Sequence, residues 1–179
     1  MKNKIATEIP GVFKIELFHA GDDRGSFTKV FHGPSMKDWD LPFELAESYF
    51  SVSQKGVVRG MHFQIPPEDH EKIVYCNTGK LNDVLLDIRE DSPTFGKSIS
   101  LPLGGSDRYA VYVPKGIAHG FEVLKDNTMM TYLVSSAHAP EFDKGILWNS
   151  FNHEWETQNP TLSQRDQEFP SFENFKTPF

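Results

Sequence analysis

Short β-prone segments separated by turn residues make up most of the chain between residues 12 and 149. The sequence lacks apolar stripes with the 3.6-residue period of a long helix, and Gly, Pro, Asp and Asn recur between the segments. This pattern predicts an all-β fold. The predicted strands cover residues 12–18, 26–32, 46–53, 57–64, 72–77, 81–88, 97–103, 109–113, 119–124 and 128–135.

The connections between the segments are rich in turn residues. Residues 78–80, 104–107 and 125–127 contain Gly, Asp or Asn, which tolerate tight or left-handed backbone. Strands at this spacing are typical of a β-sandwich or jelly roll, and only residues 34–39 have local helical character. Because the sequence contains no repeat or low-complexity segment, we expect residues 1–179 to form a single domain.

Two features modify this simple sandwich. The apolar run 81–89 contains two aspartates, Asp83 and Asp87, and such a strand is buried on both faces or lines a cavity. Asp83 is expected to orient His62 or another group of the site, and Asp87 to pair with Arg89. The polar, Pro-bearing segment after Trp148 is expected to wrap over the barrel.

Charge narrows the classes of ligand. The chain has 25 acidic and 18 basic residues, a formal net charge of −7, so we expect neither nucleic acid nor a membrane as a partner. An anionic ligand would need a local cluster of cations. A single cysteine excludes an internal disulfide, and the sequence has neither an apolar signal core nor a membrane-spanning run. We expect a cytoplasmic protein.

His62 is the first candidate for chemistry. It lies in the segment 59–64, where a regular strand would place Arg59 on the opposite face. The segment 114–121, which contains His119, resembles the second conserved motif of the cupin superfamily. Metal-binding cupins carry further ligands after the first histidine, but Gln64 is a poor ligand for a transition metal. We therefore expect no metal, which leaves His62 available as a general base.

A set of ordered motifs gives a more specific resemblance. The chain resembles the dTDP-4-dehydrorhamnose 3,5-epimerase family over nearly its entire length. The resemblance implies a cupin-like jelly-roll β-barrel with a few short helices, acting on a nucleotide-linked 4-keto-6-deoxyhexose. The motifs are Asp23-Arg24-Gly25-Ser26-Phe27, Ser51-Val52-Ser53, residues 58–64, Lys72-Ile73-Val74, residues 83–89, residues 92–97, Ala118-His119-Gly120-Phe121, Trp148-Asn149 and residues 162–166.

The resemblance also implies catalytic roles. The C4 ketone acidifies the hydrogens on C3 and C5, so a base removes one and an acid returns it from the opposite face. His62 is the implied base and Asp166 its partner, which holds the imidazole in one tautomer. Tyr132 is the implied proton donor, and Lys72 the cation beside the developing enolate oxygen. No redox cofactor is expected.

Further residues are expected at the substrate. Arg59 and Arg24 are the implied diphosphate contacts, because a guanidinium grips phosphate oxygens in a bidentate way. His119 is expected at the sugar or phosphate, and Gln64 also at the substrate. Relatives of this kind are usually homodimers that exchange N-terminal strands, so Arg24 and Phe27 are expected to serve the neighbouring site.

Several positions expected to hold the nucleotide depart from the family pattern. Where the family usually has an acidic residue, this chain has Lys29, and where the family has a Gln-x-Asn pair, this chain has Glu47-x-Tyr49. The aromatic residue that the family has before x-Pro is replaced by His138. Our hypothesis is that these four residues recognise another base. Cytosine is an example, because a carboxylate can accept a hydrogen bond from its exocyclic amine. Ordinary drift within the family is the alternative.

Two other functions fit the same sequence. A sugar-nucleotide ketoisomerase shares the barrel and the histidine but moves the carbonyl instead of inverting a carbon. A non-catalytic carbohydrate-binding barrel would have no use for His62, Tyr132 and Asp166 together. The sequence also leaves open whether C3, C5 or both are inverted.

Overall fold

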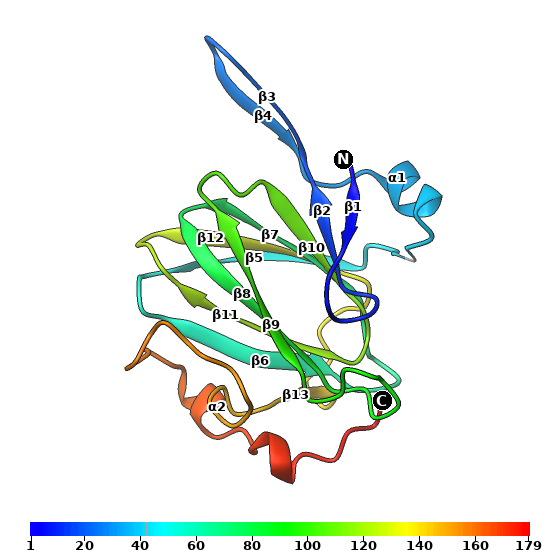
Figure 1. Cartoon of the computed structure of the whole chain (residues 1–179), viewed down its shortest axis with the longest axis vertical. Helices are drawn as coiled ribbons and strands as arrows, with labels where there is room; N and C mark the ends of the chain where they lie inside the picture. Colours follow the sequence, from blue (N-terminus) through cyan, green and yellow to red (C-terminus); the bar gives the residue numbers. More distant parts are fainter. Residues whose placement is uncertain (42) are drawn as a thin grey trace.

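The structure of the chain, a computed structural model, describes residues 1–41 and 43–179. In these residues, two antiparallel sheets lie face to face and a separate hairpin projects from one end (Figure 1). The helical elements of the same residues are short: α1 (Gly33–Asp38), α2 (Gln164–Gln167) and the 3-10 turn η1 (Phe172–Asn174). The predicted all-β jelly-roll architecture with few short helices is confirmed.

The first sheet carries one wall of the interior. Its strand order is β1-β2-β10-β7-β12-β5. In this sheet β12 pairs along its whole length with the edge strand β5, and Tyr132 lies directly opposite Tyr49. The bounds are β1 (Lys4–Ala6), β2 (Phe13–Glu16), β10 (Tyr109–Val113), β7 (Lys72–Thr78), β12 (Thr128–Val134) and β5 (Glu47–Ser53).

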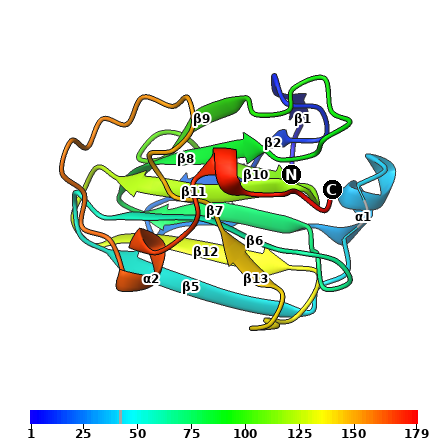
Figure 2. The ribbon, with the colours of Figure 1, turned by 90° about the horizontal axis from the view of Figure 1, so that it is seen from below.

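The second sheet carries the opposite wall, with the order β13-β6-β11-β8-β9. Figure 2 shows the C-terminal segment, with α2, running across the outer face of this sheet. The predicted wrapping of the segment after Trp148 is therefore confirmed. The bounds are β13 (Asp143–Gly145), β6 (Val58–Gln64), β11 (Ile117–Val123), β8 (Lys80–Asp87) and β9 (Ser98–Gly104).

Apolar side chains from both sheets fill the space between them. Val74 and Met130 from the first sheet pack in one cluster with Leu85 and Phe121 from the second, and all four are buried. Alternating positions along each strand point to this core because successive side chains of a strand face opposite sides. The core occupies part of the interior, and the cavities described below occupy the rest.

Strands β8 and β11 are buried on both faces. All seven residues of β11 are buried, because the core covers one face and the C-terminal segment covers the other. On β8 both aspartates are fully buried, as the sequence predicts for this strand. Asp87 accepts a hydrogen bond from Arg89 Nη2 at 2.7 Å, which confirms that pair.

The N-terminal strands differ from the prediction. The predicted strand 12–18 is interrupted at Leu17, so that β2 joins the first sheet whereas β3 (Phe18–Asp22) pairs only with β4 (Gly25–Lys29). Strand β4 ends at Lys29, so the predicted strand 26–32 extends beyond the observed one. Buried Leu17 ends the part of the chain that packs on the core, and the β3–β4 hairpin extends beyond it (Figure 1).

The elements missing from the prediction are short. Strands β1 and β13 and the turn η1 have three residues each and α2 has four, which is too few to give a period in the sequence. Strand β3, with five residues, is also absent from the prediction except for Phe18. The helix expected at 34–39 is confirmed as α1, with Pro34 in its first turn. Among the described residues, no helix is long and apolar enough to cross a membrane.

Candidate active site

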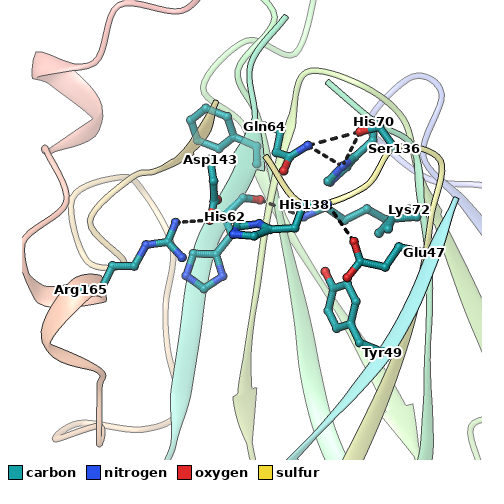
Figure 3. A pocket seen from close by; sticks show the side chains of 12 residues that line it. Glu47, Tyr49, His62, Gln64, His70, Lys72, Ser136, His138, Asp143 and Arg165 are labelled. Atoms are coloured by element: carbon teal, nitrogen blue, oxygen red, sulfur yellow. Dashed lines mark hydrogen bonds and ion pairs between the residues drawn. The ribbon is translucent and has the colours of Figure 1, made fainter. Parts of the chain in front are cut away.

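Two adjoining cavities lie between the sheets and share the side chains of Tyr49, His62 and Lys72. The outer cavity has a volume of about 350 Å³, and Figure 3 shows the side chains that line it. The inner cavity has a volume of about 190 Å³. Besides the shared residues, the inner cavity is lined by Ser51, Arg59, His119, Gly120, Phe121 and Tyr132.

A β-bulge brings Arg59 and His62 to the same cavity. On β11, His119 and Phe121 are two positions apart in the sequence, but their partners on β6, His62 and Arg59, are three positions apart. The extra residue reverses the alternation of side chains, so the expectation that Arg59 lies on the opposite face is wrong. Arg59 Nε donates to Ser53 Oγ at 3.0 Å, which orients the guanidinium.

The two strands approach closely at this bulge. A Cβ atom on Gly60 would lie 2.6 Å from Gly120 Cα, and a Cβ on Gly120 would lie 2.7 Å from the carbonyl oxygen of Arg59. Gly60 also has a φ of 122°. Only glycine combines this φ with so close a backbone contact.

His62 and Asp166 form a hydrogen-bonded pair. His62 Nε2 donates to Asp166 Oδ1 at 2.8 Å, and the N–H of Gly60 donates to Asp166 Oδ2 at 3.3 Å. Asp166 is buried in α2, whose N-cap Ser163 accepts from the Asp166 N–H. The C-terminal segment therefore supplies the carboxylate that the sequence predicts, and Nδ1 of His62 is left as the unprotonated nitrogen.

Burial and pairing act in opposite directions on this dyad. Burial lowers the pKa of His62, and the hydrogen bond and charge of Asp166 offset part of that effect. Burial opposes ionisation of Asp166, but the hydrogen bonds from His62 and Gly60 hold its pKa below the usual value. At neutral pH the pair is a neutral imidazole beside a carboxylate, which is the form a general base needs.

Phe169 holds the other side of the imidazole. Its ring meets His62 edge to face with the centroids 5.7 Å apart, and Arg165 lies over the Phe169 ring at 5.1 Å. Gly145 on β13 gives this ring its space, since a Cβ there would overlap the Phe169 side chain. The orientation of His62 thus depends on the C-terminal segment at two points.

Tyr132 and His119 form a second buried group. Their rings meet edge to face at 6.0 Å, and His119 Nε2 donates to the fully buried Asp83 Oδ1 at 2.6 Å. Asp83 therefore orients His119 and not His62. Burial raises the pKa of Tyr132, so the residue is a protonated phenol at neutral pH and is able to donate a proton.

Lys72 places a cation beside the dyad. The side chain is 6% exposed, and its Nζ donates to the carbonyl oxygen of His62 at 3.2 Å. Burial lowers its pKa to about 8, whereas Asp143 and Asp83 act to raise it. The ammonium form is thus held in a poorly solvated place, where a positive charge interacts strongly with a developing oxyanion.

Gln64 connects two loops at the rim of the outer cavity. Its Oε1 accepts from the N–H of Ala139 and its Nε2 donates to the carbonyl of Glu68, both at 2.7 Å. Both polar atoms of the amide are thus bound to main chain. Gln64 lines the cavity, but its contacts hold the loop that carries His138.

The outer cavity carries more charge than the sequence indicates. Glu47 Oε2 accepts from the N–H of His138 at 2.8 Å, and Arg165 Nη2 pairs with Asp143 Oδ2 at 2.7 Å (Figure 3). Asp143, Arg165 and His70 are site residues absent from the sequence prediction. They come from a three-residue strand, a short helix and a loop, and only the position of Arg165 beside Asp166 could have indicated one of them.

The hairpin residues lie away from both cavities of their own chain. Arg24 is almost fully exposed and pairs with Asp22, and Phe27 is 59% exposed. Lys29 is the last residue of β4, on the same projecting hairpin (Figure 1). The structure therefore brings together ten of the thirteen predicted site residues, all except these three.

Across residues 1–41 and 43–179, no three His, Cys, Asp or Glu side chains gather as a metal site would require. His70 Nδ1 lies 3.3 Å from both the Gln64 amide nitrogen and the Ser136 hydroxyl. Its side chain belongs to the loop network of the outer cavity.

Comparisons with known proteins identify the family of the chain. The family model for dTDP-4-dehydrorhamnose 3,5-epimerase matches residues 6–174. The chain is 39% identical to a Shigella flexneri dTDP-4-dehydrorhamnose 3,5-epimerase over 167 residues, 92% of each chain. It is 37% identical over 163 residues to a Streptomyces niveus dTDP-4-dehydrorhamnose 3-epimerase, covering 89% of this chain and 79% of the other.

A solved structure gives the same result in three dimensions. The dTDP-6-deoxy-D-glucose-3,5-epimerase of Legionella pneumophila, in complex with dTDP-4-keto-L-rhamnose, superposes with a TM-score of 0.92 and 31% identity. The match covers 97% of this chain and 94% of that one. The chain therefore belongs to the dTDP-4-dehydrorhamnose 3,5-epimerase family and is a carbohydrate epimerase.

Proposed function

We propose that the chain inverts C3, C5 or both in dTDP-4-dehydro-6-deoxyglucose, with His62 as base and Tyr132 as acid. The observation that carries this proposal is the inner cavity, which a neutral imidazole paired with Asp166 and a protonated phenol line together. The relatives named for this activity supply the substrate class.

Proton removal is the task of His62. The C4 ketone withdraws electrons from the neighbouring C–H bond, and Nδ1 takes the proton while the bonding pair forms the enolate. Asp166 stabilises the imidazolium that results, because a carboxylate attracts the new positive charge. Lys72 stabilises the enolate oxygen in the same way.

Proton return is the task of Tyr132. The enolate carbon takes the phenol proton on the face opposite His62, which leaves the carbon inverted. The imidazolium then passes its proton to the phenolate, directly or through solvent, which restores both His62 and Tyr132, so the cycle consumes no oxidant or reductant. No cofactor is needed, because the ketone is already part of the substrate.

The diphosphate requires cations in an acidic chain. Arg59 lines the inner cavity and Arg165 the outer one, so each cavity offers a guanidinium. We place the sugar in the inner cavity between the proton-transfer groups, and the nucleotide in the outer cavity.

A cytidine nucleotide is a second candidate because of Glu47. This carboxylate lines the outer cavity and already accepts the main-chain N–H of His138. A carboxylate accepts a hydrogen bond from the exocyclic amine of cytosine, and thymine has a carbonyl at that position. His138 lines the same cavity, where an imidazole could stack on either base.

We also propose that the protein works as a homodimer. The β3–β4 hairpin projects from its own barrel and carries exposed Phe18 and Phe27, whose rings lie 6.4 Å apart. Exposed apolar residues also follow the edge strand β5, namely Phe50 and Val52. Such surfaces are typical of an interface, and Arg24 would then reach the neighbouring site.

Isotope labelling tests the proton transfer. In deuterated water the wild-type enzyme should incorporate deuterium at C3, C5 or both of the 4-keto sugar, as measured by NMR. His62→Asn should lower this incorporation by more than about 10²- to 10⁴-fold, because the enolate has no other route. Activity of His62→Asn within tenfold of wild type would refute the assignment of His62 as the base. In the wild type, absence of label would favour a protein that only binds the sugar, and a shifted ketone would favour a ketoisomerase.

The pH profile tests the role of Asp166. The base form of His62 is neutral, so activity falls as the pH drops through its lowered pKa. Asp166→Asn removes the partner that raises this pKa, so the acidic limb of kcat/KM should move to lower pH. The plateau should fall by about 10²- to 10⁴-fold, since the tautomer is no longer fixed. A limb that moves to higher pH would contradict the assignment.

Calorimetry distinguishes the two nucleotides. Titration with dTDP and with CDP should show tighter dTDP binding if the altered outer cavity reflects drift alone. If Glu47 reads the cytosine amine, CDP binds more tightly, and Glu47→Gln should reduce that preference by about tenfold. Clearly tighter dTDP with no effect of Glu47→Gln would end the cytidine candidate.

Complementation tests the exchange of hairpins. Arg24→Ala and His62→Asn chains should each be nearly inactive alone. When they are mixed after unfolding and refolding, roughly a quarter of the wild-type sites should become active, because each mixed dimer has one intact site. Light scattering should show a dimer. A monomer, or no recovery of activity on mixing, would remove the hairpin from the site.

A further inference from the structure

Tyr49 forms a stacked pair with the proton donor. Tyr49 and Tyr132 are direct partners on the antiparallel strands β5 and β12. Their ring centroids lie 4.7 Å apart with an interplanar angle of 21°. Side chains that face each other on paired strands restrict each other's rotamers, and an offset aromatic stack adds a preferred orientation.

The other side of Tyr132 is already fixed. His119 meets its ring edge to face, and buried Asp83 holds His119. The phenol ring of Tyr132 thus lies between the ring of Tyr49 and an imidazole that is hydrogen-bonded to a buried carboxylate. Tyr49 is 42% exposed, whereas His119 is 3% exposed. Tyr49 is therefore the more exposed of the two aromatic neighbours that set the angle of the donor.

Tyr49 also lies where the two cavities meet. It lines both of them, between Glu47 in the outer cavity and Ser51 in the inner one. These three residues alternate along β5, so they face the same side. Burial, together with Glu47 and Asp143, raises the pKa of Tyr49 to about 12, so the stack brings no charge to the donor at neutral pH.

We propose that Tyr49 is a positioning residue that acts through Tyr132 and sets how the enolate is divided between inversion and exchange. This inference rests on the proposed proton transfer. The enolate carbon can take a proton from the His62 imidazolium, which restores the original configuration and the neutral imidazole. It can instead take the phenol proton of Tyr132, which inverts the carbon and leaves a phenolate for the imidazolium to reprotonate. The stack favours the second outcome, because it holds the phenol toward the cavity.

The test incubates the enzyme with dTDP-4-dehydro-6-deoxyglucose in deuterated water and measures two rates. The exchange rate is the rate at which label appears in recovered substrate, and the inversion rate is the rate at which label appears in the epimer. In Tyr49→Ala the ratio of exchange to inversion should rise about tenfold while proton removal stays within a few-fold, because His62 is untouched. Tyr49→Leu, which keeps apolar volume without a ring, should behave in the same way. Tyr49→Phe, which keeps the stacking ring, should rescue most of the inversion.

Phe95→Ala is the matched control. Phe95 is 46% exposed and packs on one other ring, Phe172, at 5.6 Å, but it lines neither cavity. Its ratio should equal that of the wild type. A wild-type ratio in Tyr49→Ala and Tyr49→Leu, or an equal fall of both rates, would overturn the positioning role and leave the proposed function standing. A wild type that neither exchanges nor inverts would overturn the proposed function and this inference with it.

Discussion

The contact between Asp166 and strand β6 is the interaction on which the site depends. One carboxylate oxygen binds the imidazole of His62 and the other binds the N–H of Gly60, so a single buried charge fixes both the side chain and the strand beneath it. A buried carboxylate without such partners would be strongly unfavourable. The C-terminal segment therefore cannot leave the barrel without leaving that charge unpaired. The completeness of the site is in this way tied to the folding of the last fifteen or so residues.

Much of the fold and most of the candidate catalytic groups can be predicted from the sequence, for a physical reason. Regular strands alternate their side chains, so the β-rich segments and their turns can be read directly, as for β7 and β12. Motifs fix the types of His62, Lys72, Tyr132 and Asp166, and the structure brings these four together around the inner cavity and its rim. What joins them, however, is the pairing of distant strands.

The features that the sequence does not predict are those that break regularity. The bulge between β6 and β11 adds one residue and so reverses the face of Arg59, which no period-two argument could foresee. Asp143 and His70 reach the outer cavity from a three-residue strand and a loop, where position depends on tertiary contacts such as the amide of Gln64. Leu17, which ends β2, appears in the sequence as one more apolar residue of a longer strand.

In the function that we propose, the two cavities meet two different kinds of constraint. Groups that move protons must keep fixed relative positions, and the inner cavity meets this need through buried pairs, His119 with Asp83 and His62 with Asp166. Groups that select a nucleotide need only complement its edges, and the outer cavity, where we place the nucleotide, has more exposed charges such as Arg165. Tyr49 belongs to both sets, since its ring stacks on the proposed donor Tyr132 and it also lines the outer cavity. A change of residue at this position would therefore alter both proton transfer and nucleotide binding. For this reason its effect must be measured as the ratio of exchange to inversion and not as affinity alone.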